Sequence, residues 1–144
     1  MVSQTYLGNP NLKAKSVPVS FTKEEVQEYV KCSKDPIYFA KKYIKIINVD
    51  KGLVPFNMYN FQEDMVSSFN NNRFNICKLP RQSGKSTTVT AYILWLILFN
   101  DSLNIAILAN KGSLARDLLG KIQFAYEYLP PWLQQGIVVW NKGN

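Results

Sequence analysis

The residues best suited to chemistry form one run, Leu79-Pro80-Arg81-Gln82-Ser83-Gly84-Lys85-Ser86-Thr87. Gly84-Lys85-Ser86 is the second half of a phosphate-binding loop. Glycine lets the backbone curl so that its amides face phosphate oxygens, lysine places a cation on the β- and γ-phosphates, and the serine hydroxyl takes one position on Mg²⁺. The run therefore predicts a site for ATP and Mg²⁺, with Ser86 as the metal ligand.

The context of the run supports this interpretation, although the first glycine of the consensus is replaced by Leu79. An apolar segment, Phe74 to Leu79, precedes the loop and is expected to be a strand. The apolar run Lys85 to Phe99 follows and is expected to be a buried helix, whose N-terminus would face the anion. The alternative is an ordinary strand-to-helix turn with a surface lysine.

Two further side chains are candidates for the same site. Arg81 lies inside the loop, where an arginine can stabilise the charge that develops during phosphoryl transfer. A surface arginine or an ion pair is the alternative. Gln62 precedes Gly84 by 22 residues, and its amide can both donate to and accept from an adenine edge. A solvated glutamine on a helix is the alternative there, and Phe61 could pack nearby.

The rest of the chain contains signals for the elements that must position this loop. Thr22-Lys-Glu-Glu25 is a capping box that predicts a helix over about 23–32. Asp35-Pro36 predicts a second helix start, and the spacing of Ile37, Ala40, Ile44 and Ile47 predicts that one face of this helix is apolar. Apolar spacing predicts a helix over 60–70, capped by Asn60 and Glu63. Further predictions are a turn at 48–52, strands over 104–109 and 136–140, a helix from Ser113 to about 128, and a turn at 141–144.

From residue 74 onward the predicted order is strand, helix, strand, helix, strand. Short apolar strands that alternate with helices indicate a parallel sheet covered on both faces. The predicted fold class is therefore α/β, an incomplete P-loop NTPase of the RecA-like kind, preceded by a small helical segment. We expect an irregular arm over 1–20, a helical segment over 21–72, and the first half of the ATPase core over 73–144.

Composition excludes several classes of function. The 144 residues include no histidine, which excludes histidine-dependent catalysis and histidine metal sites. Cys32 and Cys77 are too far apart to predict a zinc site or a disulfide framework. The run Val89 to Phe99 is too short to cross a bilayer, so no membrane segment is expected. A formal charge of +7 is compatible with a polyanionic partner such as nucleic acid.

The sequence lacks an acidic residue at the end of a predicted strand. A P-loop ATPase needs a carboxylate at the end of a neighbouring strand to hold Mg²⁺. After Lys85 the acidic residues are Asp101, Asp117 and Glu127, and none ends an apolar strand. We therefore expect the chain to be a piece of a larger domain that hydrolyses ATP only when it is completed.

The chain resembles the large terminase subunit of T-even-like tailed bacteriophages over nearly its whole length. The loop Pro-Arg-Gln-Ser-Gly-Lys-Ser-Thr is similar to the deviant Walker A of that family. Segments in the same order support the resemblance: 6–13, 35–43, 59–65, 107–113 and 129–143. The resemblance ends before the Asp-Glu strand, the coupling motif and the nuclease domain of the family.

The resemblance implies an ATPase that drives double-stranded DNA through a portal into a preformed capsid in the host cell cytoplasm. Its partners would be DNA, the portal protein and the small terminase subunit, within a homo-oligomeric ring. It implies Arg81 and Lys85 as catalytic residues and Gln62 as the residue that reads adenine. The implied nucleotide-binding set is Gln62, Arg81, Gln82, Ser83, Gly84, Lys85, Ser86 and Thr87.

Two alternatives stay open at this point. A superfamily 2 helicase-like translocase also places a glutamine upstream of its phosphate loop. A non-catalytic module that binds nucleotide or DNA would account for the missing acidic strand and for the positive charge.

Overall fold

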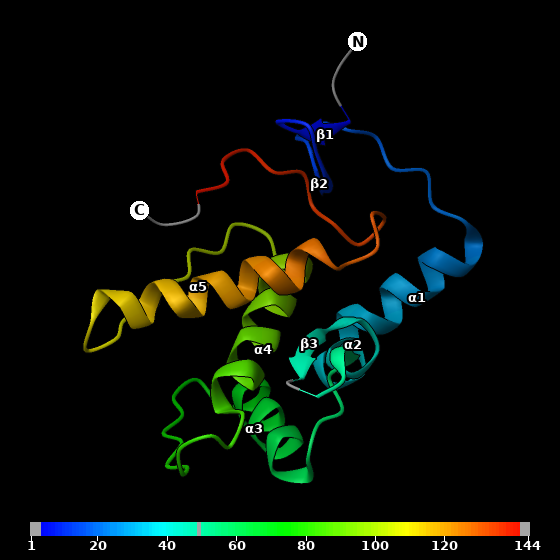
Figure 1. The fold of residues 1–144 in the computed structure, drawn as a ribbon. Helices are drawn as coiled ribbons and strands as arrows, with labels where there is room; N and C mark the ends of the chain where they lie inside the picture. Colours follow the sequence, from blue (N-terminus) through cyan, green and yellow to red (C-terminus); the bar gives the residue numbers. More distant parts are fainter. Residues whose placement is uncertain (1–3, 49, 142–144) are drawn as a thin grey trace.

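The computed structural model describes residues 4–48 and 50–141, and its elements are five helices and two short hairpins (Figure 1). The helices are α1 Lys23–Lys34, α2 Pro36–Tyr43, α3 Asn60–Asn71, α4 Lys85–Phe99 and α5 Gly112–Glu127. The hairpin strands are β1 Thr5–Tyr6 with β2 Asn9–Lys13, and β3 Lys45–Asn48 with β4 Gly52–Pro55. Both strand pairs are antiparallel.

Helix α4 is the centre of the packing, and α2, α3 and α5 all contact it. Its sequence is apolar nearly all round, as expected of a helix with neighbours on several sides. Ala91, Leu94 and Leu98 are buried, and the indole Nε1 of Trp95 donates to the Cys32 carbonyl at 2.8 Å. One hydrophobic core therefore contains residues of the N-terminal helices and of α4, on both sides of the boundary expected between residues 72 and 73.

Local capping signals fix the starts of the first two helices. The Thr22 hydroxyl accepts from the Glu25 amide, and the Glu25 carboxylate accepts from the Thr22 amide, so the predicted capping box is confirmed. The Asp35 carboxylate accepts from the amides of Ile37 and Tyr38. Pro36 occupies the first helical position, where its missing N–H costs nothing.

The segment expected to be an irregular arm, 1–20, contains the β1–β2 hairpin in its described part, 4–20. The β1–β2 hairpin lies beside the C-terminal segment, the red strip of Figure 1. Lys15 donates its amide to the Ile137 carbonyl, and Ile137 donates to the Lys13 carbonyl. Gln134 is buried and donates to the Asn11 carbonyl at 2.9 Å, so one side chain ties the two ends of the chain together.

The parallel sheet predicted for 74–140 is not present in the described residues. Residues 74–79 and 104–109 form no strand, and 136–140 contributes only an isolated bridge from Ile137 to Ala14. Phe74 is 82% and Ile76 99% exposed, and the green segment between α3 and α4 extends away from the helices (Figure 1). A strand requires a hydrogen-bonded neighbour, and the described residues provide none for these apolar segments.

The helix predictions are largely confirmed. Helix α4 spans the predicted range, and α3 and α5 cover theirs with ends shifted by a residue or so. The helical face predicted to reach Ile47 is wrong beyond Tyr43, because 45–48 pairs with 52–55 as a strand. Neither strand was predicted, although the turn between them was. The turn predicted at 141–144 lies almost wholly outside the described residues. No helix in the described part of the chain is long and apolar enough to cross a membrane.

The two cysteines provide a test of this fold. Cys32 is fully buried, and desolvation together with the nearby Glu28 carboxylate raises the pKa of its thiol to about 12. Cys77 is exposed in the unpaired segment 74–79. At pH 8.5 we expect iodoacetamide to modify Cys77 at least about tenfold faster than Cys32, because only the thiolate reacts and Cys32 stays a buried neutral thiol. Mass spectrometry of the native chain measures both rates.

Unfolding the chain in guanidinium chloride is the control, since it should make the two rates comparable. Protection of Cys77 in the native chain would show instead that residues 74–79 are paired in a sheet.

Candidate functional site

The predicted phosphate loop, residues 80–84, is a tight turn that ends where α4 begins. Gly84 has φ of 75° and is the N-cap residue of α4, and Gln82 also has a positive φ of 62°. Left-handed backbone of this kind is readily adopted by glycine and rarely by other residues. The first amides of α4 have no partner within the helix, so they are available at the end of this turn.

The charged residues of the loop lie on its outer side. The Lys85 ammonium donates to the Pro80 carbonyl at 3.1 Å, which folds the side chain back across the turn. Arg81 is exposed, and within the described residues it makes no hydrogen bond or ion pair. Both cations are therefore near the turn, and neither is fixed by a carboxylate.

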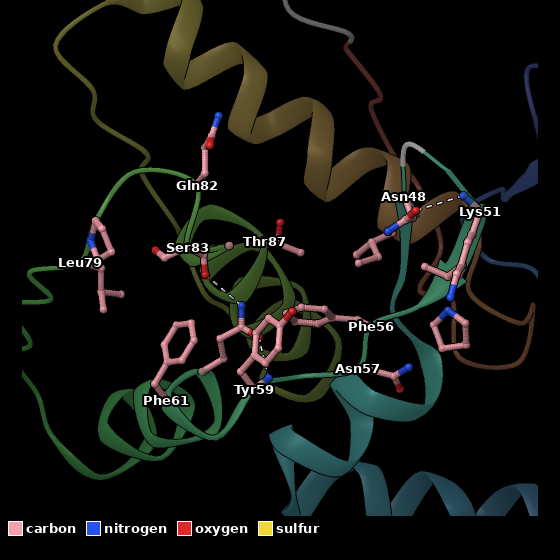
Figure 2. Close-up of a pocket in the computed structure, with 16 residues that line it drawn as sticks. Asn48, Lys51, Phe56, Asn57, Tyr59, Phe61, Leu79, Gln82, Ser83 and Thr87 are labelled. Carbon is pink, nitrogen blue, oxygen red and sulfur yellow. Dashed lines mark hydrogen bonds between the residues drawn. The ribbon is translucent and has the colours of Figure 1, made fainter.

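A pocket of about 870 Å³ opens beside the loop (Figure 2). Three parts of the chain line it: the loop with the start of α4, the start of α3, and the β3–β4 hairpin with the residues that follow it. Its volume is in the range of sites for cofactor-sized ligands. Among the described residues, its lining includes Lys51 and no aspartate or glutamate, so the pocket favours an anionic ligand.

Two aromatic rings stand at the α3 side of this pocket. Tyr59 and Phe61 are stacked, with ring centroids 5.9 Å apart and planes 9° apart. Both side chains are exposed at the pocket, and Figure 2 shows them on the side opposite Gln82, which points away from them. A flat apolar surface next to a phosphate loop suits a planar base.

Gln62 lies between the rings and the loop, with 2% of its surface exposed. Its Oε1 accepts from the Tyr59 amide at 2.9 Å, which caps the start of α3 in place of the predicted pair Asn60 and Glu63. Its Nε2 donates to the Ser83 carbonyl at 3.2 Å. A Cβ built on Gly84 would lie 2.5 Å from the same Nε2. The side chain is therefore packed directly against the loop backbone.

The Ser83 hydroxyl is buried and has no hydrogen-bond partner in the described part of the chain. A buried hydroxyl without a partner costs free energy unless a ligand or water satisfies it. Ser83 lines the pocket, but its hydroxyl oxygen is itself covered by protein atoms. The positive φ of Gly84 and the free amides of α4 are the features of this turn that suit an anionic ligand.

The predicted metal ligand faces a different cavity. Ser86 lines a second pocket of about 860 Å³ between β3, α4 and α5, and Thr87 lines both pockets. The second pocket contains the carboxylate of Asp117, but the described residues include no group of three or more residues able to hold a metal ion. Gln62, Gln82, Ser83, Gly84 and Thr87 share the first pocket, whereas Arg81 and Lys85 line neither one.

Sequence reasoning missed the contribution of the β3–β4 hairpin. Ile46, Asn48, Lys51 and Val54 close one side of the first pocket. The Asn48 side chain accepts from the Lys51 amide at 3.0 Å, which fixes this turn (Figure 2). The signal was available, because β-branched residues flank a turn rich in Asn, Asp and Gly.

The family comparison agrees with the resemblance found in the sequence. Residues 76–144 match the model of a family of phage terminase large subunits, so this part of the chain is similar to that family. The matching family is described as the terminase large subunit of T4likevirus type, N-terminal part. The match includes the loop and α4, whereas Tyr59, Phe61 and Gln62 precede it.

The contact between Gly84 and Gln62 gives the first mutational prediction of the site. Gly84→Ala should lower the free energy of unfolding by about 2–4 kcal/mol, because left-handed backbone costs an alanine ~1–2 kcal/mol and the new methyl group displaces Gln62. Gly8→Ala is the matched control. Gly8 has φ of 79° and nothing within 4 Å, so its replacement should cost about 1–2 kcal/mol. Urea denaturation measures the free energy of unfolding of both variants. Equal losses in the two would contradict the contact between Gly84 and Gln62.

Proposed function

We propose that this chain binds ATP with Mg²⁺ at the first pocket and forms the nucleotide-binding part of a viral DNA-packaging motor. One observation carries the proposal. The loop that precedes α4 in the family-matched residues forms one pocket with a stacked aromatic pair and no carboxylate. This combination suits a ligand with a planar base at one end and a negative chain at the other.

Different residues of the chain would bind the phosphates, the metal ion and the base of the ligand. The amides at the start of α4 would hold phosphate oxygens, and Lys85 would leave the Pro80 carbonyl to contact them. Thr87, which lines the first pocket, would offer its hydroxyl group to Mg²⁺, which neutralises phosphate charge when it is bound. Ser86, the predicted ligand, lines the second pocket and would have to turn toward the first to join it. Tyr59 and Phe61 would stack on the base.

The motor function rests on the family and on the exposed Arg81. Large terminase subunits use ATP hydrolysis to move double-stranded DNA, together with a portal protein and a small subunit, in the host cytoplasm. Arg81 carries no ion pair in the described residues, so it is free to move toward a γ-phosphate. We propose that hydrolysis requires an acidic strand supplied by the remainder of such a subunit, because no acidic side chain lines the first pocket.

The same absence of carboxylates at the pocket favours a second candidate function, a nucleotide-binding module without hydrolysis. Adding a fragment that carries the Asp-Glu strand of a T4-like terminase distinguishes the two. Restored ATP hydrolysis supports the motor, and tight ATP binding with no hydrolysis in either case supports the module.

Lys85→Ala tests the nucleotide site directly. We expect the affinity for Mg·ATP to fall about 10- to 100-fold, since a hydrogen bond to a charged group contributes ~1.5–3 kcal/mol. Isothermal titration calorimetry measures it on the purified chain. Lys78→Ala is the control, because Lys78 is exposed and lines neither pocket. Unchanged affinity in Lys85→Ala would reject the loop as the phosphate site.

Arg81→Ala separates binding from turnover. We expect ATP affinity to stay within about threefold of the unmodified chain, because Arg81 lies outside both pockets. ATP hydrolysis with the added Asp-Glu fragment should fall about 10³-fold or more, the range found for arginine fingers. Arg73→Ala is the control for loss of an exposed arginine. If affinity and hydrolysis fell by the same factor, Arg81 would be a ground-state contact.

A further inference from the structure

We propose that an apolar groove between the start of α1 and the C-terminal segment binds a peptide segment of a partner protein, one that carries apolar side chains and a carboxylate. The groove has a volume of about 450 Å³ and shares no lining residue with the proposed nucleotide pocket. Residues 17–21, α1 and residues 132–136 form its sides, so the blue linker that leads to α1 faces the orange-red segment after α5 across it (Figure 1).

The α1 side of the groove exposes apolar side chains in a regular pattern. Val26 and Val30 are one helical turn apart, and they are 48% and 44% exposed. Phe21 is exposed to a similar extent and extends the same surface beyond the start of the helix. A grouped apolar surface of this kind suits the apolar side chains of a bound segment.

The walls of the groove are tied to the rest of the protein, so the groove exists before anything binds. The Tyr29 ring makes edge-to-face contacts with Phe21 and Phe99, with ring centroids 6.1 and 5.0 Å apart. On the opposite side, a Cβ built on Gly136 would lie 2.9 Å from the Lys15 Cα, so glycine allows these two backbone segments to approach. A preformed groove lowers the ordering cost of binding.

A cation of the groove lacks a counter-ion in the part of the chain that the structure describes. Lys13 lines the groove and is half-buried, and neither ion pair of the described residues includes it. Burial lowers the pKa of Lys13, because desolvation disfavours its charged form. No described aspartate or glutamate lines the groove. A carboxylate on the occupant would supply the missing charge, which favours an acidic segment over a basic one.

Charge also favours a partner protein over a second copy of the chain. The formal charge of the chain is +7, so two copies repel each other. An acidic partner is attracted by the same charge.

The first experiment selects peptides from a displayed library of random 12-residue sequences on the purified chain. The Val30→Asp variant is present in excess in solution, where it removes peptides that bind elsewhere. Val30 is exposed, so this variant should fold, and an unchanged far-UV circular dichroism spectrum checks it. We expect the selected peptides to be rich in apolar residues and to contain more Asp and Glu than Lys and Arg. Failure to enrich any sequence, or enrichment of basic ones, overturns the proposal.

The second experiment measures the affinity of the most enriched peptide by calorimetry. Val26→Asp should weaken binding about tenfold or more, because it places a charge on the apolar wall. Lys13→Gln should weaken it about two- to tenfold, and this loss should vanish when the acid of the peptide is replaced by its amide. Leu119→Asp is the matched control, since Leu119 is similarly exposed on α5 and does not line the groove.

Either of two results would contradict the proposal at this stage. A loss in Lys13→Gln that persists with the amide peptide would exclude the charge pair. An equal loss in Leu119→Asp would show that the peptide does not bind in the groove.

Sedimentation of the chain without peptide tests the second copy as occupant. We expect a monomer at the concentrations used for calorimetry. A dimer that Val30→Asp dissociates would assign the groove to a second copy and overturn the partner protein. None of the substituted residues lines the nucleotide pocket, so these outcomes hold whether or not the chain binds ATP.

Discussion

The conformation of Gly84 is the constraint on which the pocket depends. A φ of 75° turns the chain out of the loop and into α4, and the helix then runs through the centre of the core. Burial of Ala91, Leu94 and Leu98 fixes the axis of α4, and Gly84 fixes where it begins. The apolar packing thereby holds a set of unpaired amides at a defined place beside α3 and the β3–β4 hairpin.

Elements specified by neighbours in sequence were predictable, and those specified by distant partners were not. Thr22 and Glu25 lie within one helical turn, as do Asp35 and the amides that it caps, so α1 and α2 followed from local chemistry. Segment 74–79 has the composition of a strand, but composition supplies no neighbour to pair with. The β1–β2 hairpin shows the converse, because β2 contains the buried Leu12 and is bonded on either side of it, at Asn11 and Lys13, to Gln134, more than a hundred positions away.

The candidate site shows the same division. The turn at Gly84 and the start of α4 at Lys85 could be predicted because the spacing of those residue types is itself the signal, whereas phosphate binding there stays a prediction. The proximity of Gln62 to the loop was also anticipated, since an adenine-side glutamine must lie near it. The orientation of the Gln62 amide was not anticipated. Two backbone groups, 21 and 3 residues away in the sequence, bind its two ends. Whether a polar side chain faces ligand or backbone depends on distances that a sequence does not contain.

The placement of the acidic side chains explains why the pocket is open to an anion. Glu28 accepts from Lys42 and from two tyrosines where α1 meets α2, and Glu63 pairs with Lys41 at 2.6 Å on the α3 side. These carboxylates neutralise lysines of α2 and join helices, and neither lines the pocket. Lys51, Arg81 and Lys85 near the loop have no such partners in the described residues. An anionic ligand that enters the pocket would therefore meet no opposing carboxylate among the described residues.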